Sequence, residues 1–145
     1  MAADSAAPVG RTERAAGGAL ADSPFHFSRR PNRAHEVPWQ EWDRYAFDRA
    51  REHDRPVLLS ISGAWCHWCH VMDETTYSDQ RVIDMLSSRF VCIRVDADER
   101  PDVDARYNAG DWPTTAFLTP AGDTITATTY LDPAQMLSAM QSMLD

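Results

Sequence analysis

Residues 57–70 have the sequence VLLSISGAWCHWCH, and this stretch decides the fold. Its first five residues form an almost continuous apolar run, which is typical of a strand buried on both faces of a parallel sheet. Cys66 and Cys69 follow in a CxxC pattern, on a loop that leads into a helix. The stretch therefore predicts a buried strand, a loop and a helix, with the two cysteines at the start of the helix.

The segments on either side continue the alternation of strands and helices. Apolar residues at helical spacing predict a first helix from Pro38 that is stopped at 54–56, with Trp39 and Trp42 in the core. Downstream, the patterns predict a helix from Ser78, a strand at 90–95, a helix at 103–107 capped by Asp102, strands at 115–118 and 124–130, and a last helix opened by a capping box at Asp132.

Strands that alternate with helices imply a parallel core, and the turn at 120–123 adds an antiparallel edge. The order therefore predicts an α/β class and a thioredoxin-like fold, with a central mixed sheet of about four or five strands flanked by helices.

Length and composition fit one soluble globular domain. The chain has 145 residues, of which 43% are hydrophobic and 25% charged. Residues 1–24 are small, polar and unpatterned, which predicts a disordered leader before a domain at 25–145. The net charge of −8 argues against nucleic acid as a partner, and no apolar run approaches the length of a membrane span. Because no secretory signal is recognisable, a cytoplasmic location is expected.

The CxxC pair has a chemical use at the start of a helix. The partial positive charge of the helix N-terminus stabilises a thiolate on Cys66, which can then attack a substrate disulfide. Cys69 is expected to resolve the mixed disulfide, and His67 between the two can lower the pKa of Cys66 when it is protonated. These three residues are the candidate catalytic pair and its tuning residue, and protein thiols or disulfides are the expected partners.

A second motif supports this interpretation. Trp112 and Pro113 stand directly before the predicted strand at 115–118. A proline there suits a cis peptide facing the dithiol, where it would keep metal from bridging the sulfurs. The backbone of Trp112 would then be free to pair with an extended substrate. Trp65, Trp112 and Pro113 are accordingly predicted to bind substrate.

Other chemistry remains open at the same residues. The segment 66–70 matches the CxxCH pattern of covalent haem, and Cys66, Cys69 and His70 could contribute to a zinc site. Covalent haem normally needs export, for which no signal is recognisable, and no second ligand pair for zinc follows in the sequence. We therefore expect no metal and no cofactor. The acidic residues from Asp96 to Asp104 lack the glycine and glutamate of a calcium loop. Cys92 is interpreted as a buried strand residue, with a third redox thiol as the alternative.

Three segments carry a resemblance to a known family. They are ISGAWCHWCHVM at 61–72, FVCIRVDADERPDVDARY at 90–107 and DWPTTAFLTPAGD at 111–123. They resemble the thioredoxin-like domain of the spermatogenesis-associated protein 20 family and its bacterial relatives, over roughly residues 25–130. In longer members this domain precedes a large helical barrel similar to sugar hydrolases, so a helical barrel domain is a further expected partner.

The chain departs from ordinary thioredoxins beneath the dithiol. Those usually carry a buried aspartate six residues before the first cysteine, where this chain has Ser60, and a lysine at the position of Cys92. The departure predicts slower resolution by Cys69, and the bulk of Trp112 predicts a narrower substrate groove. Two hypotheses follow: a thiol–disulfide oxidoreductase acting on protein disulfides, or a redox-inactive thioredoxin-fold module that docks a partner.

Overall fold

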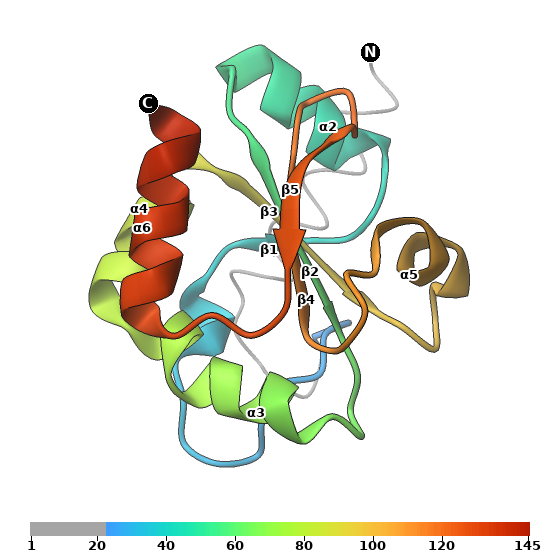
Figure 1. The fold of residues 1–145 in the computed structure, drawn as a ribbon, viewed down its shortest axis with the longest axis vertical. Helices are drawn as coiled ribbons and strands as arrows, with labels where there is room; N and C mark the ends of the chain where they lie inside the picture. The colour runs from blue at the N-terminus through green and yellow to red at the C-terminus, as the bar shows by residue number, and fades with distance from the viewer. Residues whose placement is uncertain (1–22) are drawn as a thin grey trace.

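The computed structural model describes residues 23–145, and the predicted leader at 1–24 lies outside these residues except for its last two positions. A five-stranded mixed sheet forms the centre, with the strand order β1-β3-β2-β4-β5 (Figure 1). Strands β1, β3 and β2 pair in parallel, and β4 pairs antiparallel with both β2 and β5, so the predicted mixed sheet is confirmed. The strands are β1 (Trp39–Gln40), β2 (Val57–Ser62), β3 (Val91–Asp96), β4 (Thr114–Leu118) and β5 (Thr124–Thr128).

Helices cover both faces of the sheet. Helices α4 and α6 lie on one face, α2 and α5 lie on the other, and α3 crosses the end of the sheet at the carboxyl end of β2 (Figure 1). The helices are η2 (Ala34–Glu36), α2 (Arg44–His53), α3 (His67–Glu74), η3 (Thr76–Ser78), α4 (Gln80–Arg89), α5 (Pro101–Tyr107) and α6 (Pro133–Leu144). No helix within residues 23–145 combines the length and the apolar character needed to cross a bilayer.

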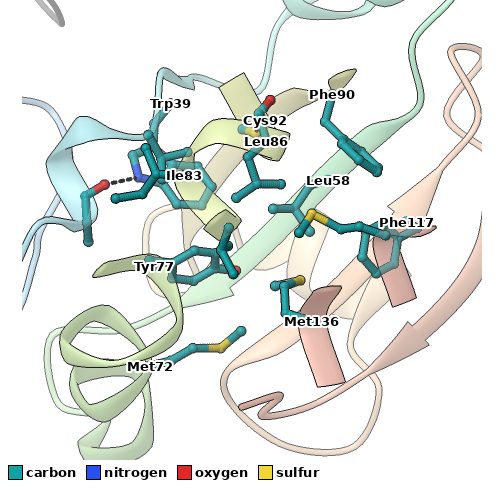
Figure 2. Packing of buried hydrophobic residues seen from close by; sticks show 14 residues of the cluster. Trp39, Leu58, Met72, Tyr77, Ile83, Leu86, Phe90, Cys92, Phe117 and Met136 are labelled. Atoms are coloured by element: carbon teal, nitrogen blue, oxygen red, sulfur yellow. Dashed lines mark hydrogen bonds between the residues drawn. The ribbon is translucent and has the colours of Figure 1, made fainter. Parts of the chain in front are cut away.

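The central strand β2 is buried along its whole length, which explains its nearly continuous apolar sequence. Side chains alternate between the faces, so Leu58 packs with Trp39, Tyr77 and Phe117 under α4 and α6 (Figure 2). Leu59 and Ile61 pack on the opposite face, against α2 and α5. Strand β2 thus contributes to two apolar cores. Its carboxyl end, which leads to the cysteines, is held by packing on both faces of the sheet.

The prediction of a helix from Pro38 is wrong at its start. Trp39 lies in β1, paired in parallel with Cys92, and its indole Nε1 donates to the carbonyl of Ala34 at 2.9 Å. Helix α2 begins only at Arg44, because the Asp43 side chain caps it by accepting from the amide of Ala46. Trp39 is buried, as expected of a core residue. The spacing that suggested one helix therefore spans a short edge strand and a separate helix.

Two further boundaries differ from the sequence prediction. Asp102 does not cap α5: the N-cap is Arg100, whose guanidinium binds the Asp102 carboxylate at 2.8 Å. Helix α4 starts after Asp79, whose side chain accepts from the amides of the first turn, so Ser78 belongs to η3 instead. The Asp79 side chain thus caps α4, whereas the N-cap of α5 makes no side-chain hydrogen bond to the first turn.

The capping box at the start of α6 is confirmed and carries a stability prediction. Asp132 Oδ1 accepts from the amide of Gln135 at 2.8 Å, and the Gln135 side chain accepts from the amide of Asp132 at 2.9 Å. Replacing Asp132 by alanine is expected to lower the free energy of unfolding by about 1 kcal/mol, because an amide at the helix N-terminus loses its acceptor. Urea denaturation measures the change. Ser138→Ala, exposed in the same helix, should change it by about 0.5 kcal/mol or less.

Candidate functional site

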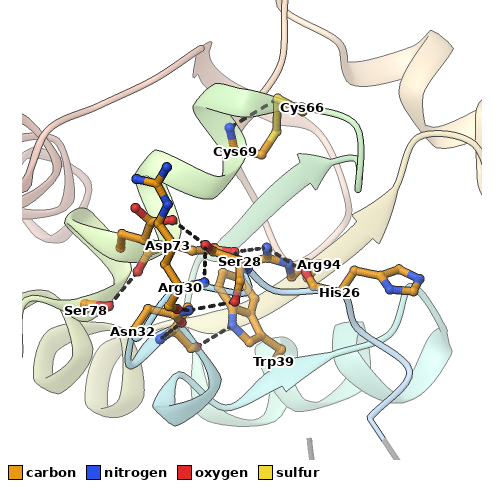
Figure 3. A network of polar contacts seen from close by, with 12 residues as sticks. His26, Ser28, Arg30, Asn32, Trp39, Cys66, Cys69, Asp73, Ser78 and Arg94 are labelled. Atoms are coloured by element: carbon orange, nitrogen blue, oxygen red, sulfur yellow. Dashed lines mark hydrogen bonds and ion pairs between the residues drawn. A yellow bond between two sulfur atoms is a disulfide. The ribbon is translucent and has the colours of Figure 1, made fainter. Parts of the chain in front are cut away.

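The two cysteines lie where β2 leads into α3. The strand ends at Ser62, and Cys66 is the N-cap of α3, with extended backbone at φ −94° and ψ 111°. Its Sγ accepts from the amide of Cys69 at 3.2 Å, which occupies one of the free N–H groups of the first turn. The two sulfurs are joined as a disulfide, with 5.3 Å between the Cα atoms (Figure 3). The CxxC prediction of a dithiol at the helix start is thereby confirmed in position.

The surroundings of the pair favour a thiolate on its first member. The amide of Cys69 and the dipole of α3 point at the Sγ of Cys66. Both cysteines are buried, with 6% of Cys66 and 3% of Cys69 exposed. His67 follows in the first turn with an exposed side chain, and its ring contacts the indole of Trp68 at 5.4 Å between centroids. The first sulfur therefore lies beside fixed positive partial charge.

Trp65 stands before the pair with 54% of its surface exposed, yet it is held firmly. Its Nε1 donates to Asp98 at 2.8 Å, and its ring meets Trp112 edge to face at 5.2 Å. Gly63 lies directly beneath the indole: a Cβ built on this glycine would come within 2.5 Å of the Trp65 ring. Glycine at position 63 therefore lets the indole lie flat against the loop.

The Trp112–Pro113 peptide bond is cis, the isomer that the sequence motif suits. Pro113 is buried at the start of β4, and Trp112 is half-buried. The indole of Trp112 donates from Nε1 to Asp104 at 3.0 Å, which fixes it from α5. Trp112 and Trp65, both predicted as substrate-binding residues, are thus brought into contact, each tied to an aspartate on its other side.

A groove of about 270 Å³ opens beside the pair, lined by Trp68, Asp111, Trp112, Thr129 and Tyr130. Trp68 is 55% exposed, and its ring meets Tyr130 at 5.5 Å. Sequence reasoning did not assign Trp68 or Tyr130 to the site. The tryptophan between the two cysteines was the available signal, because an aromatic side chain beside a reactive pair offers contact surface to a bound segment.

Cys92 lies in the core on β3, with 1% of its surface exposed. Its Sγ is 3.8 Å from the carbonyl of Leu86, and burial raises the pKa of the thiol well above its usual value. A thiolate is therefore disfavoured at this position. These surroundings fit the interpretation of Cys92 as a buried strand residue, and its role as a third redox thiol stays a hypothesis.

The acidic residues after β3 have local partners. Asp96 accepts from the amide of Asp98 at 2.8 Å and from that of Glu99 at 3.2 Å, while Asp98 holds the indole of Trp65. Within residues 23–145, no three side chains of His, Cys, Asp or Glu converge as metal ligands would. The acidic segment shapes a turn and positions a tryptophan beside the dithiol.

A buried ion pair beneath α3 was missed by sequence reasoning. Asp73 and Arg94 are 2.9 Å apart, with only 1% and 4% of their side chains exposed (Figure 3). Asp73 Oδ2 also accepts from the amide of Ser28 at 3.0 Å, and Arg94 Nη2 donates to the carbonyl of His26 at 3.1 Å. The segment before η2 thus supplies main-chain contacts to both charges.

Aromatic rings and burial complete the surroundings of the ion pair. The Arg94 guanidinium lies 4.8 Å from the ring centroid of Phe27 and 5.2 Å from that of Trp39. Burial raises the pKa of Asp73 above its usual value, although Arg94 and the amide of Ser28 act to lower it. A carboxyl group that is harder to ionise than usual therefore lies one helical turn beyond Cys69.

Comparisons with known proteins agree with this geometry. The family Thioredox_DsbH, described as protein of unknown function DUF255, matches residues 19–145. Human spermatogenesis-associated protein 20 is 37% identical over 110 residues, which are 70% of this chain and 14% of that protein. The thiol:disulfide interchange protein DsbD of Campylobacter jejuni is 36% identical over 45 residues, which are 31% of this chain and 8% of that protein.

The fold is that of solved thioredoxins. A thioredoxin from Thermus thermophilus superimposes with a TM-score of 0.65 and 27% sequence identity, covering 73% of this chain and 85% of that one. The thioredoxin-like fold predicted from the sequence is therefore confirmed, as is the resemblance carried by the three segments around the dithiol. The match to the curated relatives spans about a seventh of their length.

Proposed function

The chain belongs to the Thioredox_DsbH family of thioredoxin-like proteins, and on this basis we propose that it is a thiol–disulfide oxidoreductase that acts on protein disulfides through Cys66 and Cys69. One observation carries the proposal. Cys66 caps α3 with its Sγ accepting from the amide of Cys69, and the two cysteines are close enough to be joined as a disulfide. The helix N-terminus stabilises a thiolate on Cys66, and the short distance lets the two cysteines form and open a disulfide with each other.

The reaction proceeds in two exchanges. The Cys66 thiolate attacks one sulfur of the substrate disulfide, and the other substrate sulfur leaves with the bonding electron pair. Cys69, as a thiolate, then attacks Cys66 and displaces the first substrate sulfur. The substrate disulfide is reduced, the pair is oxidised, and a thiol reductant must restore it. His67 is proposed to favour the Cys66 thiolate when protonated, since it lies within the first turn of α3.

The proposed substrate is a protein segment that lies across Trp65, Trp112 and Pro113. Support comes from the groove at Trp112, which offers aromatic faces next to the disulfide. In the cytoplasmic location expected from the sequence, the glutathione and thioredoxin pools would favour the reductase direction. The potential of the pair, which a titration measures, decides the direction.

A docking module is the second candidate function. Ser60, buried on β2, is a hydroxyl where ordinary thioredoxins have a carboxylate. Relatives of this family are also much longer than the matched segment, which leaves room for a partner domain such as a helical barrel. A docking module would bind its partner equally well after Cys66→Ser, whereas an oxidoreductase would lose turnover.

A redox titration in glutathione buffers tests the proposed function. Trp65 and Trp68 are exposed next to the pair, so disulfide formation is expected to change tryptophan emission. We expect one two-electron transition, with a midpoint in the range of roughly −270 to −120 mV spanned by thioredoxin-fold oxidoreductases. Intact mass confirms the oxidation state, and Cys66→Ser should abolish the transition. A wild-type protein whose thiols stay free in every buffer would leave the docking module as the function.

A further inference from the structure

The second exchange requires Cys69 to lose a proton in a buried position. Cys69 is 3% exposed, so bulk water has little access to its sulfur. Ser60, which stands where an acid is usual in this fold, is a poor proton acceptor because its hydroxyl is neutral. With serine at position 60, β2 supplies no acidic group to take the proton.

Asp73 is the buried carboxylate closest to Cys69 along the helix. It follows Cys69 by four residues, so both side chains lie on the same face of α3 on successive turns (Figure 3). Within residues 23–145, Asp73 is the one carboxylate whose side chain is buried. A second observation points the same way: Asp73 Oδ2 is bonded to Ser28 and Arg94, whereas Oδ1 has no hydrogen-bond partner among the described residues.

An orphaned carboxylate oxygen in a protein interior normally finds a donor, because leaving it unpaired is costly. The thiol of Cys69, freed when the disulfide opens, is a donor on the same face of the helix. A water molecule between the two could relay the proton across any remaining gap. Oδ1 therefore stays available as an acceptor for the Cys69 S–H that forms when the disulfide opens.

We propose that Asp73 is the proton acceptor for Cys69 in the second exchange, an inference that rests on the proposed oxidoreductase function. Oδ1 takes the proton of the Cys69 thiol, and the resulting thiolate attacks the Cys66 sulfur of the mixed disulfide. The bond between Cys66 and the substrate sulfur breaks, and its electron pair leaves with the substrate thiolate. When a reductant reopens the disulfide, Asp73 returns the proton to Cys69.

Charged and titratable groups around Asp73 support this role. Arg94 from β3 and the amide of Ser28 keep the carboxylate ionised, while burial works in the opposite direction and raises its pKa. Tyr77 from η3 and Cys92 from β3 also lie in this buried region, and burial raises both of their pKa values, so neither competes as a base. His70 and Glu74 belong to α3 itself, and Glu74 is bonded to the Ser28 hydroxyl. A base whose pKa is raised accepts a proton more readily than an exposed carboxylate.

The test separates the two exchanges in one reaction. Reduced protein is mixed with dithiobis-nitrobenzoate: the first thionitrobenzoate released reports attack by Cys66, and the second reports attack by Cys69. In Asp73→Asn we expect the first release to be unchanged and the second to slow by about 10²-fold at pH 7, the usual effect of losing a general base. The second release should then rise tenfold per pH unit and reach the wild-type rate above the pKa of the thiol.

If Asp73 only stabilised the fold, the second release in Asp73→Asn would not return to the wild-type rate at high pH. Glu74→Gln is the matched control, because it removes the neighbouring carboxylate of the same helix and should leave both releases unchanged. If Asp73→Asn unfolds, the pair Asp73→Asn/Arg94→Met removes both buried charges and should show the same slow second release. A folded variant whose second release equals wild type at pH 7, or is slower by the same factor at every pH, would overturn the inference. A wild-type protein that shows no second release would instead refute the proposed function.

Discussion

Replacing Cys69 by serine is expected to hold a protein substrate on Cys66 as a mixed disulfide. Cys66 keeps its place at the N-cap of α3, where free N–H groups stabilise its thiolate. Without the second sulfur nothing nearby can displace the substrate, so the intermediate accumulates. Reduced Cys69→Ser mixed with insulin as the protein disulfide should give nearly one adduct per chain, seen by non-reducing electrophoresis and intact mass.

Cys66→Ser gives the opposite expectation and serves as the paired variant. It should form no adduct with the same substrate, because Cys69 lies one turn inside the helix and not at the N-cap, where free N–H groups stabilise a thiolate. Cys92→Ser should behave as wild type in this assay, since Cys92 is buried in the core. If Cys69→Ser formed no more adduct than Cys66→Ser, the two-step exchange proposed for this pair would be wrong.

Replacing Arg94 by methionine is expected to lower the free energy of unfolding at pH 7 by about 3–5 kcal/mol. Methionine approximates the length of the arginine stem, so the main loss is the charge that compensates the Asp73 carboxylate. Arg94 also contacts the rings of Phe27 and Trp39. Urea denaturation measures the change, and Asp73→Leu/Arg94→Met should recover most of it, because no unpaired charge is left in the core.

The loss in free energy of unfolding caused by Arg94→Met is expected to depend on pH. Burial already raises the pKa of Asp73 in the folded protein above the ordinary 3.8, and removing the guanidinium raises it further. The folded variant therefore binds a proton more tightly than the unfolded chain does, and its stability must increase as pH falls through that raised pKa. The difference from wild type should shrink between pH 7 and pH values near 4. A deficit that stayed constant over this interval would mean that Asp73 is not the group left unpaired.

Much of the fold follows from local sequence patterns. The apolar run of β2, the CxxC before α3 and the capping box of α6 each depend on residues within a few positions of one another, and all three were predicted. The edge strand β1 was not predicted. Its two residues are held by pairing with β3, a contact across more than fifty positions that helical spacing cannot reveal. The indole of Trp39 adds a local bond to Ala34, five positions earlier.

In the candidate site, too, the parts set by local motifs could be predicted and those set by tertiary packing could not. The dithiol follows from a short motif, and the Trp-Pro motif suits the cis peptide that the structure shows before Pro113. Asp73 and Arg94 could not be paired from the sequence, because they are 21 positions apart and share no motif. Arg94 stands within an apolar strand, and such a residue signals a buried partner. The packing of α3 against β3 decides which carboxylate pairs with Arg94, and local sequence patterns do not specify that packing.

The hydrogen bond from the amide of Ser28 to Asp73 has a consequence for amide exchange with solvent. Ser28 lies in a segment without helix or strand, where amides ordinarily exchange quickly. Its N–H, however, is bonded to a carboxylate that is 1% exposed. Deuterium should therefore enter at Ser28 about as slowly as at β2 and β3, while the amide of the exposed neighbour Arg29 exchanges at once. Slow exchange at this single position would show that the irregular segment opens together with the core.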